Sequence, residues 1–426
     1  MPLLLLFFPI ALAMEGVSTE TESRAMSNPR IKEAITLMNH FAERTGLTSK
    51  QPPRRYLWTD AFAVCNYLGL ARSTGEHAYT ERALQLVDQV HRTLGRHRDD
   101  DSRPGWISGL GEKEGVQHPT RGGLRIGKAL PERGPGELID ERLEWDRDGQ
   151  YFHYLTKWMH ALDQVARNTQ QPHYNAWARE LAHTAFHAFT YTSARERYPR
   201  RMAWKMSIDL TRAQVPSMGQ HDPLEGYITN LQLRATAATL PQNTVDPDLE
   251  DETSQFAAMI KDGEWATTDP LGLGGLMIDA YRMQQLRRHD EPSDDELIIN
   301  LLTASLTGLH YYARSGELQQ PAQYRLAFRE LGLTIGLHAV ERMQRMNGEK
   351  AQPTATSSSL GKLLKALMGY ISLREEIEAF WRAPEHQHTT TWTQHQDINE
   401  VMLATSLAPD GFLELLLHGS PGKEVE

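Results

Sequence analysis

The sequence predicts an all-α protein on three observations. Apolar residues recur three and four apart along many segments, as at Tyr174, Trp177 and Leu181, which is the period of a helix buried on one side. Runs that alternate polar and apolar residues and are rich in Val, Ile and Thr, as strands are, do not appear. Hydrophobic residues make up 40% and charged residues 23% of the chain, as in ordinary globular proteins.

The helical period places about twelve segments in chain order. They are predicted at 30–45, 59–72, 79–95, 148–168, 173–191, 223–239, 249–261, 270–288, 294–314, 322–346, 359–381 and 395–407. Several begin with a carboxylate. Asp222 and Asp269 each precede a proline, so we expect them to be N-caps with proline at the first helical position. Asp60 and Asp148 open two further segments in a similar way.

Two connections, 96–147 and 192–222, are too long for simple links between helices. The first is rich in glycine: 11 of the 31 glycines of the chain fall between Gly95 and Gly149. Glycine allows tight turns and close backbone approach, so this segment is interpreted as a lid over a pocket. The alternative is a surface excursion without a role. Farther along, Gly332 and Gly336 lie four apart in an apolar helix, which predicts a close helix crossing.

The N-terminal residues 1–28 are expected to stand apart from a single domain at 29–418 and a tail at 419–426. The apolar stretch from Leu3 to Ala13 is too short to span a membrane. Either it is a clipped export signal, which would make the protein periplasmic or secreted, or translation begins at Met14 or Met26. The second reading, with a cytoplasmic protein, is slightly favoured.

Charge and motif content exclude several classes of function. The formal net charge of −10 makes bulk nucleic-acid binding unfavourable, and no integral membrane association is expected. The single cysteine, Cys65, cannot form an internal disulfide and is predicted to be a small buried residue. Glycine-rich phosphate loops are missing, and His386, His388 and His395 complete no recognised ligand spacing, so neither a cofactor nor a metal is predicted. The oligomeric state is left open.

Four segments carry a resemblance to a known architecture: Tyr56–Phe62, Trp145–Tyr154, Met218–Leu224 and Asp269–Leu271. Twelve helices in six pairs, with aromatic and acidic residues at the start of several second helices, resemble the (α/α)6 toroid of the six-hairpin glycosidase superfamily. The resemblance implies a funnel at one face of the toroid, where a sugar or other small polar substrate binds. It also implies that the acidic helix starts and both long connections gather there.

Glycoside hydrolysis needs one carboxylic acid and one carboxylate on either side of the scissile bond. Asp146 and Asp148 are too close in sequence to face each other, so the expected pair is one of them with Asp60, Asp209 or Asp222. The alternative is that these residues only cap helices.

Side chains expected to bind the substrate combine aromatic faces for stacking on a sugar ring with polar groups for its hydroxyls. They are Trp58, Arg125, Trp145, Gln150, Tyr151, His153, Trp204, Lys205, Arg212, Gln220 and His221.

Two other functions stay open. Toroidal sugar epimerases and isomerases resemble this architecture and move protons with histidines, a role for which His153, His221 and His338 are candidates. His338 lies inside an apolar run, where a hydrogen-bonded core histidine is the favoured interpretation. The remaining alternative is a toroid that binds a glycan or a partner protein without turnover.

Overall fold

A computed structural model describes residues 28–192, 200–217, 219–241, 246–287, 292–348 and 355–415, without the side chains of 292–294 and 355–358. Residues 1–27, Met218 and 416–426 fall outside these ranges, and with them the expectations about the start of the chain and its tail. Most described residues are helical, which confirms the all-α prediction. None of the described helices combines the length and apolar character needed to cross a membrane.

The long helices lie close to their predicted positions. They are α2 (Pro29–Arg44), α3 (Leu57–Thr74), α4 (His77–Leu94), α7 (Phe152–Thr169), α8 (Pro172–Phe189), α9 (Asp222–Ala237), α10 (Glu250–Ile260), α11 (Pro270–Leu286), α12 (Pro292–Tyr312), α13 (Ala327–Gly348), α14 (Ala355–Met368), α15 (Ser372–Arg382) and α18 (Gln396–Leu407). The predicted helix at 359–381 is therefore two helices, α14 and α15, separated by a turn.

Several short elements went unpredicted because two to six residues carry no readable period. The helices among them are α5 (Glu112–Gln117), α6 (Glu141–Asp146), η1 (Glu317–Gln319), η2 (Ala322–Tyr324), α16 (Pro384–Gln387), α17 (Thr390–Thr393) and α19 (Asp410–Leu413). The strands are β1 (Gln150–Tyr151), β2 (Thr190–Tyr191), β3 (Arg201–Met202), β4 (Lys205–Met206) and β5 (Ala213–Val215). Antiparallel pairing gives one sheet in the order β1-β4-β5 and another of β2 and β3.

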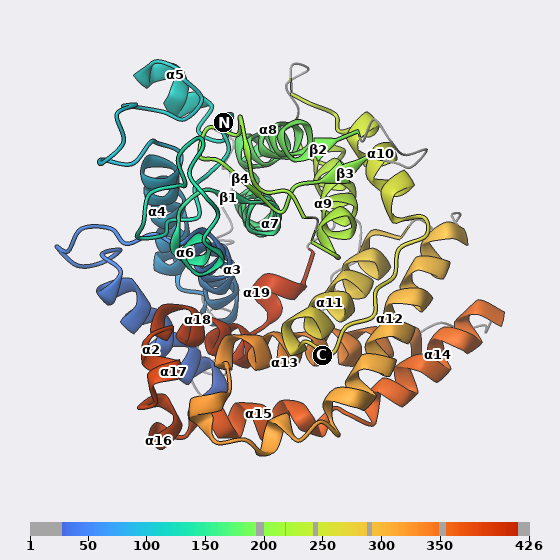
Figure 1. The fold of residues 1–426 in the computed structure, drawn as a ribbon. Coiled ribbons are helices and arrows are strands. Elements are labelled where there is room, and N and C mark those ends of the chain that lie inside the picture. The colour runs from blue at the N-terminus through green and yellow to red at the C-terminus, as the bar shows by residue number, and fades with distance from the viewer. Residues whose placement is uncertain are drawn as a thin grey trace, which may run out of the picture.

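Six of the long helices pack against one another in a closed order: α3 on α7, α7 on α9, α9 on α11, α11 on α13, α13 on α18, and α18 back on α3. We call these the inner helices. The other long helices each pack mainly on one of them: α4 on α3, α8 on α7, α10 on α9, α12 on α11, α14 and α15 on α13, and α2 on α18. In Figure 1 this second set lies farther from the middle of the molecule than the first.

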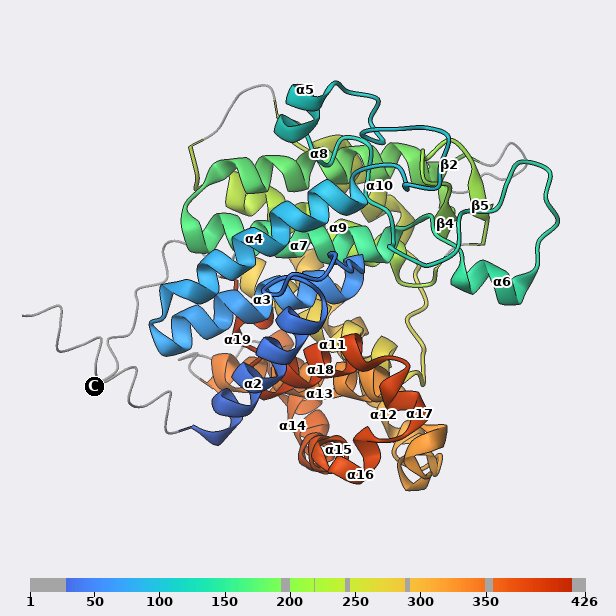
Figure 2. The ribbon, with the colours of Figure 1, turned by 90° about the vertical axis from the view of Figure 1, so that its left-hand side faces the viewer.

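The short helix α19 lies near the middle of Figure 1, where it packs against α3, α7 and α11. Seen from the side in Figure 2, α19 is at the left, whereas α6 and β5 are at the right. The short helix α19 and the strand-bearing connections therefore lie toward opposite ends of the inner helices.

The helix starts differ in part from the expectation. Asp269 is the N-cap of α11, and its Oδ1 accepts the N–H of Gly272 at 3.0 Å, as predicted. Asp222 is instead the first residue of α9, and no side chain caps that helix. Asp60 lies in the first turn of α3 and accepts the N–H of Tyr56 at 2.9 Å. Asp148 precedes the start of α7 and belongs to the connection before it. The prediction of an N-cap at Asp222 is therefore wrong.

The close crossing predicted from Gly332 and Gly336 is confirmed between α11 and α13. A Cβ on Gly336 would lie 2.6 Å from Gly274 Cα, and a Cβ on Gly274 would lie 2.1 Å from the Gly332 carbonyl oxygen. No side chain fits there, and the neighbouring atoms are backbone, which cannot move aside cheaply. The close contact between these two helices therefore requires glycine at these positions.

We expect Gly274→Ala to destabilise the protein by about 1–3 kcal/mol, because the added methyl group overpacks a backbone contact. Urea unfolding followed by circular dichroism measures the change. Gly275→Ala is the matched control: its Cβ would meet no atom within 4 Å, so better helix propensity should give up to about 1 kcal/mol of added stability. Equal effects of the two substitutions would contradict the close packing.

Candidate functional site

A cavity of about 100 Å³ lies between the inner helices. One water molecule needs roughly 10–15 Å³ by this measure, so the cavity has room for several waters or a small polar molecule. Every inner helix contributes to its lining, and α19 adds one residue. The lining residues are Trp58, Phe62, His153, Lys157, His160, Glu225, Leu271, Gly275, Ile278, Asp279, Arg282, Gly332, Ile335, Met402 and Phe412.

Beside this cavity, Asp222 and His153 meet at the starts of α9 and α7. Asp222 Oδ1 lies 3.8 Å from His153 Nδ1. His153 Nδ1, Asp222 Oδ2 and Nε2 of the adjacent His221 are buried and find no hydrogen-bond partner within the described parts of the chain. Buried polar atoms are nearly always paired in folded proteins, by protein groups or by water, so these atoms are free to bind water or a ligand.

Burial sets the protonation states of this pair. Burial and the nearby charge of Glu225 raise the pKa of Asp222 to about 8, although Lys157 and the Gly219 backbone act in the opposite direction. Burial lowers the pKa of His153 to about 4. Near neutral pH, Asp222 is therefore mostly a neutral carboxylic acid and His153 a neutral imidazole. A proton donor and a proton acceptor stand side by side.

A second carboxylate lies one helical turn from the first. Glu225 follows Asp222 by three residues on α9, a spacing that places both on the same face. Lys157 Nζ lies 2.8 Å from Glu225 Oε1, and Thr156 Oγ1 donates to Glu225 Oε2 at 2.7 Å. Burial raises the pKa of Glu225, but the charge and hydrogen bonds of Lys157 and Thr156 outweigh it, and the net shift is downward. Glu225 is therefore ionised while Asp222 is protonated.

Charged groups also line the α11 side of the cavity. Arg282 Nη1 lies 3.2 Å from Asp279 Oδ1, and Arg282 Nη2 donates to Gln232 Oε1 at 2.7 Å. Burial raises the pKa of Asp279 to about 6, with Arg282 opposing the shift. His160 Nε2 donates to the Phe412 carbonyl at 3.0 Å, which ties α7 to α19. These groups are already paired, so they shape and polarise the cavity.

Aromatic rings surround the Asp222–His153 pair on the side of α3 and the strands. The Tyr151 and Trp204 rings both stack on His153, with centroids 5.3 and 6.0 Å away. The Tyr154 and Tyr56 hydroxyl oxygens are 2.7 Å apart. Flat apolar faces next to hydroxyl groups are the surface that a sugar ring requires. We call this set the aromatic wall: Tyr56, Trp58, Tyr151, Tyr154 and Trp204.

A second hollow of about 330 Å³ adjoins the aromatic wall, because Tyr151 and Trp204 also line it. Its other lining residues come from the long connection 96–147 and from β5, and include the half-exposed Trp145, whose ring packs edge-on against Trp204 at 5.1 Å. We call it the surface groove. The glycine-rich connection thus forms one side of a pocket, next to the cavity between the helices.

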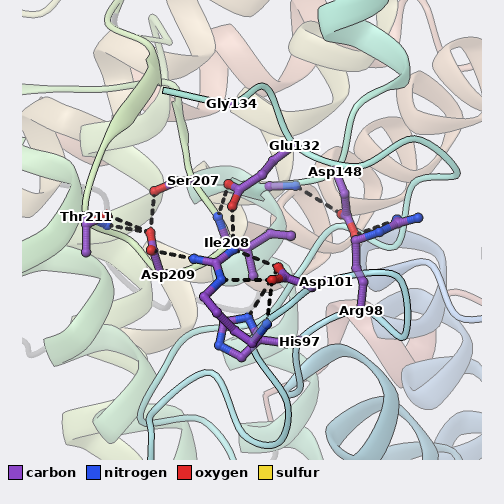
Figure 3. A network of polar contacts seen from close by, with 12 residues as sticks. His97, Arg98, Asp101, Glu132, Gly134, Asp148, Ser207, Ile208, Asp209 and Thr211 are labelled. Atoms are coloured by element: carbon purple, nitrogen blue, oxygen red, sulfur yellow. Dashed lines mark hydrogen bonds and ion pairs between the residues drawn. The ribbon is translucent and has the colours of Figure 1, made fainter. Parts of the chain in front are cut away.

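Asp148 is fully buried and holds the long connection in place. Its Oδ2 lies 2.6 Å from Arg125 Nη1 and 3.4 Å from Arg98 Nη1 (Figure 3), and its Oδ1 accepts the N–H of Gly127 at 3.0 Å. Gly127 has φ +93°, and a Cβ there would lie 2.2 Å from the Arg55 carbonyl oxygen, so only glycine allows this approach. The contacts of Asp148 are those of a structural anchor.

Asp209 links the two long connections. Its Oδ2 lies 2.6 Å from Arg103 Nη1, while Arg103 Nη2 reaches Asp101 at 2.7 Å and Glu132 at 2.8 Å. Glu132 Oε2 accepts the N–H of Ile208 at 2.7 Å. Figure 3 shows Asp101, Glu132 and Asp209 turned toward one another in this network. Both long connections do come together, as the resemblance implied, and charged pairs join them.

The other predicted carboxylates are not beside the Asp222–His153 pair. Asp60 is buried 3.5 Å from Arg55 Nη1, and burial raises its pKa to about 6 against the charge of Arg55. Asp146 is exposed at the end of α6. Neither residue lines the cavity. Asp222 does not line the cavity either, but its carboxyl group lies 3.8 Å from His153, which does.

Some of the predicted binding residues lie at the cavity, the aromatic wall or the surface groove, and the others are bound to protein groups elsewhere. Trp58, Tyr151, His153 and Trp204 come together at the cavity and the aromatic wall, and Trp145 lines the surface groove. His221 precedes Asp222 in the chain, and its ring lies 6.1 Å from that of Trp265. The others have partners in the protein: Arg125 binds Asp148, Gln150 binds the Ile208 carbonyl and Leu124 N–H, Lys205 binds Glu144, Arg212 binds the Arg133 carbonyl, and Gln220 binds the Glu264 carbonyl. His338, buried beside Glu378, is the core histidine that was expected.

Sequence reasoning missed Lys157, Glu225 and Asp279. A signal for two of them was present: Glu225 follows Asp222 by three residues and Lys157 follows His153 by four, so each shares a helix face with a predicted site residue. Asp279 had no such signal, because it lies in the middle of α11, far from any helix start.

Comparison of the chain with models of protein families, with curated proteins and with solved structures finds no match. What the protein does must therefore be inferred from the geometry of the cavity and its charged groups.

Removing the charge of Asp148 should lower the free energy of unfolding, and this effect can be measured with no substrate present. Asp148→Asn leaves Arg125 buried without its counter-charge, which typically costs about 3–5 kcal/mol. Urea unfolding measures the loss. Asp146→Asn, two residues away and exposed, is the control and should change stability by less than about 0.5 kcal/mol. An Asp148→Asn variant as stable as the wild type would exclude the anchoring role.

Proposed function

We propose that the inner helices and their outer partners form an (α/α)6 toroid. Two facts support this fold. The inner helices pack in a closed order, and five of the six carry the next long helix of the chain on their outer side. The sixth, α18, is covered by α2 from the opposite end of the described chain. Residues from all six inner helices line the cavity, as the funnel of such a toroid would require, and Phe412 of α19 adds to the lining.

We further propose that the protein is a carbohydrate-active enzyme of the glycoside hydrolase type. The observation that carries this proposal is the pair Asp222 and Glu225 on the first turn of α9, one kept protonated by burial and the other kept ionised by Lys157. Two carboxyl groups whose environments push their pKa values apart are the usual mark of an acid and a base at one site. The aromatic wall provides the stacking surface for a sugar ring.

In this mechanism Asp222 donates its proton to the glycosidic oxygen as the bond from the anomeric carbon breaks, and the leaving group departs as a neutral alcohol. Positive charge then develops on the remaining ring. The Glu225 carboxylate stabilises that charge, and Lys157 holds the carboxylate in place. Water then forms the new bond to the anomeric carbon and gives its proton to the Asp222 carboxylate, which restores the acid for the next turnover. His153, stacked on Tyr151 and Trp204, positions the Asp222 carboxyl group.

A second function is favoured by His153, whose Nδ1 has no hydrogen-bond partner among the described residues and lies 3.8 Å from Asp222 Oδ1. A neutral imidazole beside a carboxylic acid can remove a proton next to a sugar carbonyl while the acid protonates the carbonyl oxygen, which is epimerase or isomerase chemistry. Incorporation of solvent deuterium into an uncleaved sugar would identify this function. Glycan binding with neither cleavage nor deuterium incorporation would leave the non-catalytic alternative.

We expect Asp222→Asn to abolish glycoside cleavage, lowering kcat by about 100-fold or more, because general acid catalysis typically contributes 10²–10⁴-fold. Activity should be assayed on a panel of aryl glycosides and oligosaccharides. In the wild type, kcat/KM should fall as the pH rises through about 8, where Asp222 loses its proton.

The matched control is Asp251→Asn, another acidic residue in the first turn of a helix, which is exposed and should leave activity unchanged. Retention of cleavage by Asp222→Asn, or a pH profile without a falling limb near pH 8, would contradict the assignment.

Asp222→Asn should also raise the stability of the folded protein at neutral and higher pH. Asp222 binds its proton with a pKa of about 8 in the folded protein and near the ordinary value of 3.8 when unfolded, so its contribution to stability falls as the pH rises between these values. The uncharged amide of the variant carries no such penalty. Asp222→Asn should therefore gain in melting temperature over the wild type as the pH is raised from about 4 to about 8, as measured by differential scanning calorimetry. A constant difference across this range would show that burial does not disfavour the Asp222 charge.

A further inference from the structure

Two exposed histidines and one buried carboxylate meet between α8 and α10. His183 and His187 are one turn apart on α8, and Glu252 lies in the first turn of α10. Glu252 Oε1 lies 2.6 Å from His183 Nδ1 and 3.6 Å from His187 Nε2. One ligand atom from each residue falls within 4.8 Å of the others. None of the three lines the cavity or the surface groove.

The residue types and spacing suit a transition-metal ion. Two imidazoles four residues apart project from the same face of a helix, and a carboxylate from a second helix completes a set of two nitrogens and one oxygen. Metal–ligand bonds of about 2.0–2.1 Å in a tetrahedron put ligand atoms roughly 3.3 Å apart. The distances of 2.6 and 3.6 Å lie on either side of that value, so small rotations of the exposed imidazoles bring the three atoms into place.

Burial of the Glu252 carboxylate also favours a bound metal ion. Glu252 is only 6% exposed, and its carboxylate contacts the imidazoles of His183 and His187. A buried carboxylate needs a positive charge or several hydrogen bonds near it, and a metal ion held between the three side chains supplies that charge. The packing beneath is fixed, since the Phe186 and Phe256 rings of the two helices lie 5.0 Å apart. The ligands therefore stand on rigid elements.

We propose that His183, His187 and Glu252 bind a Zn²⁺ ion, with a fourth position open to water. Imidazole and carboxylate ligands in this number favour Zn²⁺ over Mg²⁺ and Ca²⁺, which prefer six or more oxygen ligands. The ion links α8 to α10, which both pack on α9, the helix that carries Asp222 and Glu225. The proposal does not depend on the proposed activity.

Isothermal titration with ZnCl₂ tests the proposal on the full chain, after removal of any affinity tag and treatment with a chelator followed by dialysis. The wild type should bind one Zn²⁺ per chain, and His187→Ala should lower the affinity at least about 100-fold. Glu252→Gln, which keeps the size of the side chain, should also weaken binding. His173→Ala is the control: His173 is an exposed histidine near the start of α8 and should have no effect.

Melting temperatures give a second readout. Zn²⁺ should raise the melting temperature of the wild type and of His173→Ala but not that of His187→Ala, while all three should melt alike without metal. Binding by His187→Ala as tight as that of the wild type, no saturable binding by the wild type, or equal binding of Mg²⁺ and Zn²⁺ would each overturn the proposal. If Glu252 and the two histidines only contact one another and bind no metal, the wild type will show no saturable binding.

Discussion

The buried ion pair between Arg125 and Asp148 is the interaction on which the aromatic wall and the surface groove depend. Asp148 stands shortly before β1, and its carboxylate is fixed by Arg125 and by the N–H of Gly127. With that point fixed, β1 pairs with β4, and the pairing carries Trp204 onto the rings of Tyr151 and His153. Without this ion pair the connection 96–147 would be free to move, because it is long and consists mostly of turns. One buried charge thus organises side chains from three distant segments.

Beneath the cavity, a network of buried polar groups keeps the helices in register. Gln232 on α9 donates to Asp163 Oδ2 at 2.7 Å and accepts from Arg282 on α11, while Asp163 also pairs with Arg167 at 2.8 Å. Arg282 continues the network to Asp279 at the cavity wall. Fully paired networks of this kind rigidify a core, because any shift leaves a buried group without its partner. The charged lining is therefore supported from behind and does not rely on loops.

Two carboxyl groups at the cavity are held in opposite protonation states at a cost in stability. Asp222 is kept neutral by burial and by the neighbouring charge of Glu225, whereas Glu225 stays ionised through Lys157. Such an arrangement lowers stability compared with a fully paired or apolar one, and proteins retain strained or destabilised groups mainly where they function. The paired carboxylates Asp148 and Asp209 are the contrast in the same molecule: they are fully engaged and stabilise loops.

The sequence by itself determined the all-α class and the positions of nearly all the long helices, because a helix that buries one face repeats its apolar residues locally and visibly. It also predicted the glycine crossing of α11 on α13, and it named Asp222, His153 and Trp204 among the candidate residues, which the structure brings close together. Only the tertiary structure separated Asp222 from Asp148, since both are acidic residues near a helix start. The difference lies in their neighbours: arginines from distant segments surround Asp148, whereas Asp222 meets a histidine and another carboxylate. Partners brought together by folding carry no mark in the local sequence, and they decide which carboxylate is held in ion pairs and which has no cationic partner within hydrogen-bond distance among the described residues.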